Sequence, residues 1–377
     1  MKHPKAYYQA IATLTGCVIG AGILGIPYVV LKAGFWTGLL VILVLGVISL
    51  LVHLMTGEIA LRTKACYQLS GYAHKYLGKW GKMFMALSMI IGVYGAMVAY
   101  TLGAGESLAV LFGGFSWMWM VVFYLVMCML LGGGVRLLEK SELFLGILKL
   151  GIFLLVLGVL FFSRHFSIEK IGGFSFSTLM IPYGMVLFAY IGTAAIPEVR
   201  EEMTSCLRLA KKAIIVGSLI PIVAYALFAL GVIGVSGILT TEVATVGVGF
   251  LTGASGFFLL HLFGILAMCT AFVSLGFALK DSFWRDFNLP KWESYALVTC
   301  VPAVLLIIGI SSFAKTLEVA GTFAGGIAGI VIVLMHYKSR NAGERRPEFS
   351  VKVPLWAYYV IIGVFAVGMV YQLASLV

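Results

Sequence analysis

The sequence predicts an all-α membrane protein with eleven transmembrane helices, and three observations support that prediction. Of its 377 residues, 62% are hydrophobic and 11% are charged, and the mean hydropathy is +1.07. A soluble domain carries about 25% charged residues, so most of this apolar surface must face lipid. The apolar residues form stretches of roughly the 20 residues that cross a bilayer. All seven tryptophans lie near the ends of these stretches, as in an interfacial aromatic belt.

The spans follow one another without an intervening soluble domain. In order, they are residues 8–32, 36–61, 82–112, 116–135, 142–162, 175–198, 208–235, 255–280, 293–311, 315–337 and 354–376. The lysines before the first span resemble the start of a signal peptide, but an apolar run of about 25 residues is too long for one. Between the second and third spans, segment 67–77 is amphipathic and predicts a helix lying in the cytoplasmic interface.

The basic residues predict the orientation. The N-terminus and the loops after the second, fourth, sixth, eighth and tenth spans hold 21 of the 26 lysines and arginines. Alternate loops hold four: Lys32, Arg164, Lys170 and Lys315. The positive-inside rule then predicts a cytoplasmic N-terminus and, with eleven spans, an external C-terminus in the cell membrane. Orientation also explains the net charge of +11 without nucleic-acid binding, since no basic and aromatic module is present.

Two spans contain clusters of helix-weakening residues. The first carries Gly16, a glycine-rich run at 20–25, and Pro27, and the sixth carries Gly192 and Pro197. Each glycine costs a helix about 1 kcal/mol relative to alanine, and proline costs more. In one span alone, close packing through small residues would be the favoured explanation of such a cluster. Two such spans at an interval of five favour unwound helices instead.

An interval of five spans is odd, so a five-helix repeat must be inverted in the membrane. We therefore expect two inverted repeats, 8–162 and 175–337, with an additional helix at 354–376. Interrupted helices at matching positions of inverted repeats mark the binding site of secondary transporters. Unwinding frees N–H groups that suit a carboxylate and carbonyl groups that suit an ammonium. An α-amino acid presents both charges, although other small zwitterions do so too.

Both clusters resemble motifs of a known superfamily. The first reads Gly16-Cys17-Val18-Ile19-Gly20-Ala21-Gly22-Ile23-Leu24-Gly25-Ile26-Pro27-Tyr28, and the second reads Phe188-Ala189-Tyr190-Ile191-Gly192-Thr193-Ala194-Ala195-Ile196-Pro197-Glu198-Val199. They resemble amino-acid/auxin permeases and bacterial aromatic amino-acid permeases, which share the leucine-transporter fold of the amino acid–polyamine–organocation superfamily. The resemblance implies amides at 20–22 for the carboxylate and carbonyls near Val18, Phe188 and Ala189 for the ammonium. The full implied substrate set is Val18, Ile19, Gly20, Ala21, Gly22, Ile23, Phe188, Ala189, Tyr190 and Thr193.

Lys149 lies midway along the fifth span, seven residues after Glu142. An ionisable residue in mid-membrane is costly and is by default a functional hypothesis; the alternative is a lysine that snorkels to the interface. The Glu142–Lys149 spacing resembles proton-coupled members of the superfamily, where the ammonium replaces a sodium ion. That resemblance implies a coupling site with three further residues: Gly16, Ile19 and Thr270. Ala271 stands where a second hydroxyl would help sodium, which weakens a sodium site.

Other polar residues within the spans allow more than one interpretation. His53 and Glu58 are expected to be solvated or packed, and His261 to be interfacial. The run 198–202 is expected to be a solvated face or, alternatively, an inner-gate ion pair. Glu106 is expected either to contact the outer vestibule or to reach water. Tyr94 and Tyr100 are expected either to line the pocket or to belong to the ordinary core.

No residue set indicates catalysis, a cofactor or a metal site, and the six cysteines lack metal-ligand spacing. The sequence therefore predicts a transporter whose partners are an amino acid, protons and the lipid bilayer. Proton coupling is the first hypothesis. The alternatives are sodium coupling, an amino-acid sensor that does not transport, and a channel.

Overall fold

The computed structural model describes residues 4–133 and 136–376, with side chains except those at 4, 136–145 and 147. These residues form helices and no strands, as expected where a bilayer offers no water to backbone groups. The helices are α1 (Pro4–Val18), α2 (Ile26–Ala33), α3 (Phe35–Arg62), α4 (Leu69–Phe112), α5 (Ser116–Gly132), α6 (Arg136–Phe161), α7 (Tyr183–Ala189), α8 (Ile196–Glu202), α9 (Ala210–Ser236), α10 (Ala244–Gly249), α11 (Gly253–Arg285), α12 (Lys291–Ile307), α13 (Phe313–Ala320), α14 (Gly326–Ala342) and α15 (Leu355–Leu376). Short turns link some of them, notably η1 (Ala21–Gly25), η4 (Thr193–Ala195) and the π-helical η7 (Gly321–Gly325).

The helices confirm an all-α protein with several transmembrane spans. Within the described ranges, six are long and apolar enough to cross a membrane, and the bent pair α1–α2 makes a seventh. They are α3, α4, α9, α11, α15 and the continuous α13–α14. Other helical segments are too short to meet this criterion alone, namely α5, the apolar part of α6, α7, α8 and α12. The count of eleven spans therefore stays a prediction.

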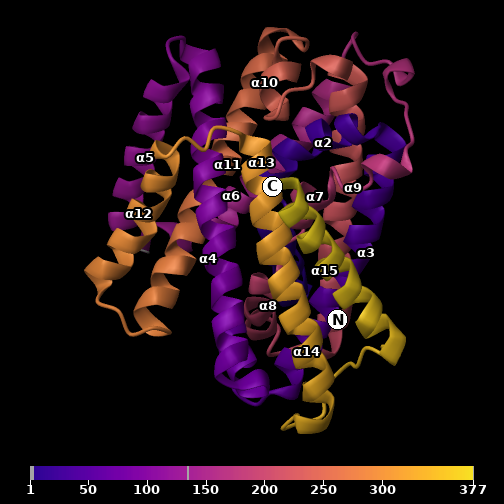
Figure 1. Ribbon diagram of the computed structural model, residues 1–377, viewed down its shortest axis with the longest axis vertical. Helices are drawn as coiled ribbons and strands as arrows, with labels where there is room; N and C mark the ends of the chain where they lie inside the picture. The colour runs from indigo at the N-terminus through magenta and orange to yellow at the C-terminus, as the bar shows by residue number, and fades with distance from the viewer. Residues whose placement is uncertain (1–3, 134–135, 377) are drawn as a thin grey trace.

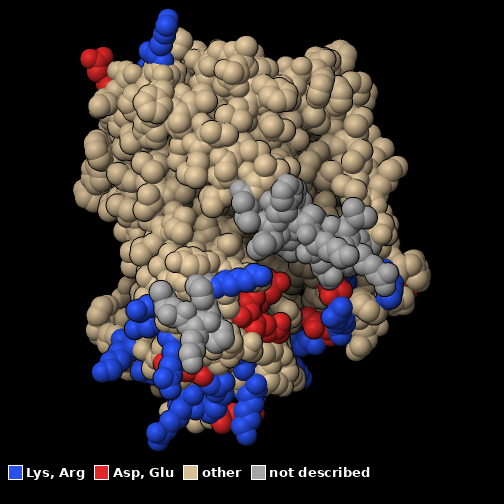
Figure 2. Space-filling model, turned by 180° about the vertical axis from the view of Figure 1, so that it is seen from behind, with Lys and Arg blue, Asp and Glu red and all other residues tan. Residues whose placement is uncertain are grey.

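Charged side chains are concentrated at one end of the molecule. Lysine and arginine gather at the lower end, together with acidic residues, while the wide band above them is almost free of charge (Figure 2). A band without charge is what the hydrocarbon region of a bilayer requires. This lower end carries the loops that the sequence assigns to the cytoplasm, and we call it the basic end.

Helix α4 forms the long axis of the molecule. It packs against α5, α11, α13 and α14, while α9 packs against α1 and α3. Helices α5 and α12 lie at one edge and α15 on the opposite side (Figure 1). The helix expected at 67–77 begins at Leu69 and forms the first part of α4. A kink at Gly78, with φ 73° and ψ −160°, separates it from the rest of α4.

Candidate functional site

The first span is interrupted where its glycines cluster. Helix α1 ends at Val18, Gly20 is extended with φ −99° and ψ −162°, and η1 precedes α2. The two arms, 5–18 and 21–33, are bent by 45°. Pro27 lies in the first turn of α2, where its missing N–H is harmless. The break therefore follows from residues that disfavour a continuous helix between two stretches that favour one.

The sixth span is interrupted in the same way. Helix α7 ends at Ala189, Gly192 adopts φ −140° and ψ 2°, and α8 begins with Pro197 in its first turn. Helix α7 occupies the upper half of the molecule and α8 the lower half (Figure 1). Both interruptions thus lie between two helical arms, and each exposes backbone groups inside the protein rather than at its surface.

The two interruptions touch each other. A Cβ atom added to Gly22 would lie 3.2 Å from the Cα of Ala189 and 3.1 Å from the ring of Phe188. A Cβ atom on Gly192 would lie 2.3 Å from a methyl group of Val18. A side chain at 192 would therefore displace Val18, and one at 22 would require Phe188 or Ala189 to move by a few tenths of an ångström. The structure brings the predicted residues Val18, Phe188 and Ala189 together.

Tyr225 of α9 connects the two interruptions, and sequence reasoning missed it. Its hydroxyl oxygen lies 2.6 Å from the Val18 carbonyl oxygen and 2.8 Å from the Ala189 carbonyl oxygen. A tyrosine hydroxyl has a single proton and can donate to only one of them at a time. The Val18 carbonyl also accepts from the Gly20 amide at 2.8 Å, so two donors serve three oxygens at a fully buried point. The cluster still has more acceptor positions than donors and suits a group that brings further donors.

Lys149 reaches the first interruption from α6. Its ammonium nitrogen lies 3.2 Å from the carbonyl oxygen of Gly16, and the residue is 8% exposed. The structure thus joins two residues of the predicted coupling set. Thr270 donates to the Leu266 and Ala267 carbonyls of its own helix, at 2.9 and 3.2 Å. Ile19 is buried, and the side chain of Glu142 lies outside the described residues.

Several polar residues that the sequence left open are packed inside. His53 is 1% exposed and contacts the Ser218 hydroxyl through Nδ1 at 2.9 Å, while Nε2 has no hydrogen-bond partner among the described residues. Glu58 is fully buried beside Arg62 and His336, at 2.7 and 3.0 Å. Both residues therefore have packed rather than solvated roles.

The contacts of two further polar residues bear on the interpretations left open by the sequence. His261 is fully buried, and its Nδ1 lies 2.8 Å from the Phe257 carbonyl oxygen one turn earlier. Its expected position at the membrane interface stays a prediction. Tyr94 donates to the Leu297 carbonyl on α12 at 3.1 Å, so it is directed away from the interruptions. Tyr100 is buried, whereas Glu106 is half-buried on α4.

Arg200 of α8 does not lie on a solvated face and forms no ion pair with a described residue. The side chain is 7% exposed and donates hydrogen bonds to three successive carbonyls that follow α3 and to the Tyr72 hydroxyl. The carbonyls belong to Thr63, Lys64 and Ala65, at 2.8, 3.0 and 2.9 Å. A cation here also complements the partial negative charge at the end of α3. We call this cluster the Arg200 clasp; no local sequence signal identifies carbonyls as its partners.

Comparisons with known proteins bear on the family and the fold. The tryptophan/tyrosine permease family matches residues 4–374. Tyrosine-specific transport system 1 of Haemophilus influenzae is 25% identical, with 89% of this chain and 88% of that protein covered. Glutamine transporter 2 of Aliivibrio fischeri is 20% identical, covering 85% and 84%. Among solved structures, Mhp1, a nucleobase-cation-symport-1 family transporter in a closed conformation with bromovinylhydantoin bound, has a TM-score of 0.64 at 15% identity over 87% of this chain and 77% of that one.

The structural likeness to Mhp1 supports a transporter fold and says nothing of substrate at 15% identity. The family match confirms the expected amino-acid permease context, although not the amino-acid/auxin branch. Together with the apolar helices, it identifies a multi-pass membrane protein. The chain belongs to the tryptophan/tyrosine permease family.

Proposed function

We propose that this protein is a secondary active transporter that moves amino acids by alternating access and is driven by protons. The observation that supports it most is the meeting of two interrupted helices at Tyr225. There the Val18 and Ala189 carbonyls face one hydroxyl, at 2.6 and 2.8 Å. An ammonium supplies three donors to such acceptors. Of the amides expected at 20–22, that of Gly20 donates to the Val18 carbonyl, so the amides of Ala21 and Gly22 at the start of η1 supply the complementary site for a carboxylate.

The relatives point to recognition of the groups that all α-amino acids share. One is named for tyrosine and another for glutamine, whose side chains differ in size and polarity. Backbone groups at the interruptions contact only the α-ammonium and α-carboxylate, so they tolerate such variation. We propose an aromatic amino acid as the substrate class, on the strength of the family match.

Coupling to protons rests on the Lys149 contact with Gly16. A lysine that binds and releases a proton changes how firmly α6 is attached to the first interruption. Such a change drives transport if the two orientations of the protein bind the proton with different affinity. Sodium is the alternative ion, and it is disfavoured because Thr270 bonds within its own helix and Ala271 has no hydroxyl.

The proposed architecture retains eleven spans, two inverted repeats at 8–162 and 175–337, and a cytoplasmic N-terminus. The gathering of lysine and arginine at the basic end supports this orientation (Figure 2). The interrupted first and sixth spans support the repeat, since they are five spans apart in the proposed order.

Uptake into proteoliposomes tests the function. With purified protein and an acidic exterior, we expect labelled tyrosine or tryptophan to accumulate, and a protonophore to abolish accumulation. Accumulation that requires a sodium gradient would instead favour sodium coupling. Saturable binding without accumulation under either gradient would favour a sensor, and movement only down the amino-acid gradient would favour a channel.

A further inference from the structure

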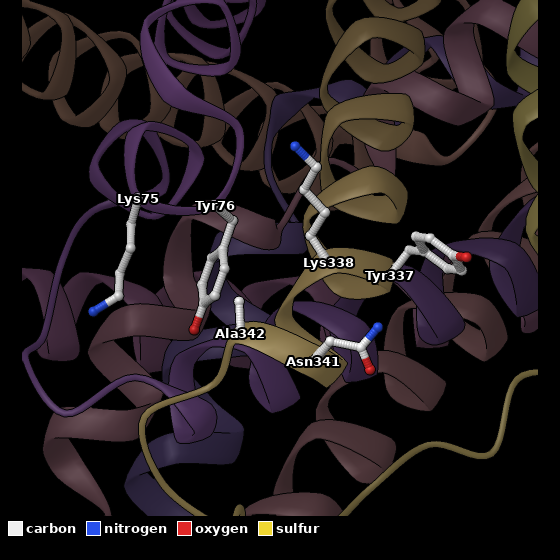
Figure 3. Close-up of a pocket in the computed structure, with 6 residues that line it drawn as sticks. All are labelled: Lys75, Tyr76, Tyr337, Lys338, Asn341 and Ala342. Carbon is white, nitrogen blue, oxygen red and sulfur yellow. The ribbon is translucent and has the colours of Figure 1, made fainter.

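A cavity of about 320 Å³ lies at the basic end, between the beginning of α4 and the end of α14. It is lined by Lys75, Tyr76, Tyr337, Lys338, Asn341 and Ala342 (Figure 3). This volume lies within the usual range for small-ligand sites. The lining contains two lysines, two tyrosines and an amide, and no carboxylate. It is separate from the interruptions and plays no part in the proposed transport chemistry.

The two lysines have different electrostatic environments. Lys75 forms an ion pair with Glu344, and the hydrogen bond from Lys75 lowers the pKa of that carboxyl. Glu344 therefore stays ionised and compensates the charge of Lys75. Lys338 is exposed and has no hydrogen-bond or ion-pair partner among the described residues. The cavity consequently has one uncompensated cation, on the α14 side.

The cavity also adjoins a surface that suits hydrocarbon. Leu334, Tyr337, Lys338 and Asn341 follow one another at intervals of three, one and three residues, so they share one face of α14. Leu334 is 43% exposed and Tyr337 is 52% exposed. On α4, Trp80 is 60% exposed just after the kink at Gly78. The surface thus changes from apolar to basic over two helical turns, at the level where aromatic residues anchor a protein in the interface.

We propose that this cavity binds the phosphate group of an anionic phospholipid, with the acyl chains along the exposed face of α14. Basic pockets between transmembrane helices at the cytoplasmic side suit anionic headgroups. The carbonyl end of α14 carries partial negative charge and would repel an anion, so binding depends on the lysines and chiefly on Lys338. A soluble phosphate has the same charge but gains nothing from the apolar half of this surface.

Lipid binding can be measured on the purified full-length protein with phosphatidylglycerol and phosphatidylcholine as probes, using native mass spectrometry and thermal stability. We expect phosphatidylglycerol to be retained preferentially and to raise the melting temperature. The variant Lys338→Gln should weaken its binding about fivefold, in line with the usual contribution of one lysine near an anionic membrane. Lys212→Gln is the matched control, because Lys212 is also exposed at the basic end but lies on α9, away from the cavity.

Three outcomes would overturn the proposal. Equal retention of both lipids would show that the cavity does not select an anion. An equal loss in Lys338→Gln and Lys212→Gln would mean that diffuse surface charge attracts the lipid. Equal stabilisation by inorganic phosphate or glycerol 3-phosphate at the same concentration would indicate a site for a soluble anion. Since Lys338 is exposed, its replacement should leave folding intact, and size-exclusion chromatography checks this.

Discussion

At the scale of single residues, the site is governed by the number of protons available to a few buried oxygens. Tyr225 places one hydroxyl proton between the Val18 and Ala189 carbonyls. Once an ammonium arrives, the hydroxyl can accept from it and still donate to one carbonyl. Tyr225 would then act as a recognition group for the α-amino group of the substrate.

The variant Tyr225→Phe tests that role. Losing one acceptor should cost about 1 kcal/mol, which corresponds to roughly fivefold weaker amino-acid binding. An analogue without the amino group should bind Tyr225→Phe and the unaltered protein equally well, measured by isothermal titration calorimetry. If both ligands lost affinity to the same extent, Tyr225 would only hold the fold together.

Lys149 yields the sharpest test of coupling. Lys149→Arg should abolish uptake driven by a pH gradient, because a guanidinium stays protonated and cannot release a proton in each cycle. Lys149→Ala should also lose accumulation while retaining substrate binding. A lysine that only snorkels predicts the reverse, since arginine reaches the interface equally well. Uptake by Lys149→Arg equal to that of the unaltered protein would rule out the proton-carrier role.

At the scale of elements, each interruption depends on how closely two backbones approach. Gly22 faces Phe188 and Ala189 at 3.1 and 3.2 Å, whereas the position of a Cβ on Gly20 has nothing nearer than 3.8 Å. The two glycines are two residues apart, yet only Gly22 is tightly packed. Gly20 instead leaves open space beside an extended backbone.

This difference predicts opposite responses to the smallest substitution. Gly22→Ala should destabilise the protein by about 1–3 kcal/mol, as overpacking does, and should separate the two interruptions. Gly20→Ala should leave the melting temperature unchanged, because its methyl group meets only ordinary contacts. Thermal unfolding in detergent compares them directly. A greater loss in Gly20→Ala would contradict the packing described for the first span.

The Arg200 clasp predicts that two substitutions lower the melting temperature to different extents. Arg200→Lys replaces a planar fork of donors with a single ammonium, which cannot reach three carbonyls and Tyr72 together. Each hydrogen bond from a charged donor contributes about 1.5–3 kcal/mol. Arg200→Lys should therefore lower the melting temperature more than Tyr72→Phe, which removes one acceptor. Equal losses would show that the carbonyl contacts contribute nothing.

At the scale of the whole molecule, the sequence predicted the helical class and the two interruptions, whereas the count of eleven spans, the inverted repeats and the orientation stay predictions. The all-α class, the long spans and the interrupted first and sixth spans were readable, because lipid and glycine impose strong local constraints. Tyr225 was not, because a tyrosine in an apolar span has no local feature that reveals its partner on another helix. The contacts of Arg200 were not predicted for the same reason, because its partners are backbone carbonyls, which every residue carries.

At this scale, the testable prediction is the orientation of the protein in the membrane. Cys66 is exposed at the basic end, in the loop after α3. A membrane-impermeant maleimide should label it from the cytoplasmic side, in inverted vesicles but not in right-side-out cells. A variant with Cys66→Ser is the control for labelling at other cysteines. Labelling of Cys66 from outside would reverse the assigned orientation of every span.

The kink at Gly78 has a mechanical consequence. A positive φ of 73° belongs to a backbone region that side chains resist, and a Cβ atom added at this position would meet nothing within 4 Å. The outer side of the joint is therefore open, while its inner side is packed, because Gly81 lies against Ala73 and Leu77 across the kink. The segment 69–77 is attached to α8 through Tyr72, to the end of α11 through Ser70 and to the loop after α14 through Lys75. A displacement of α8 would thus be transmitted through this segment to the basic ends of α11 and α14.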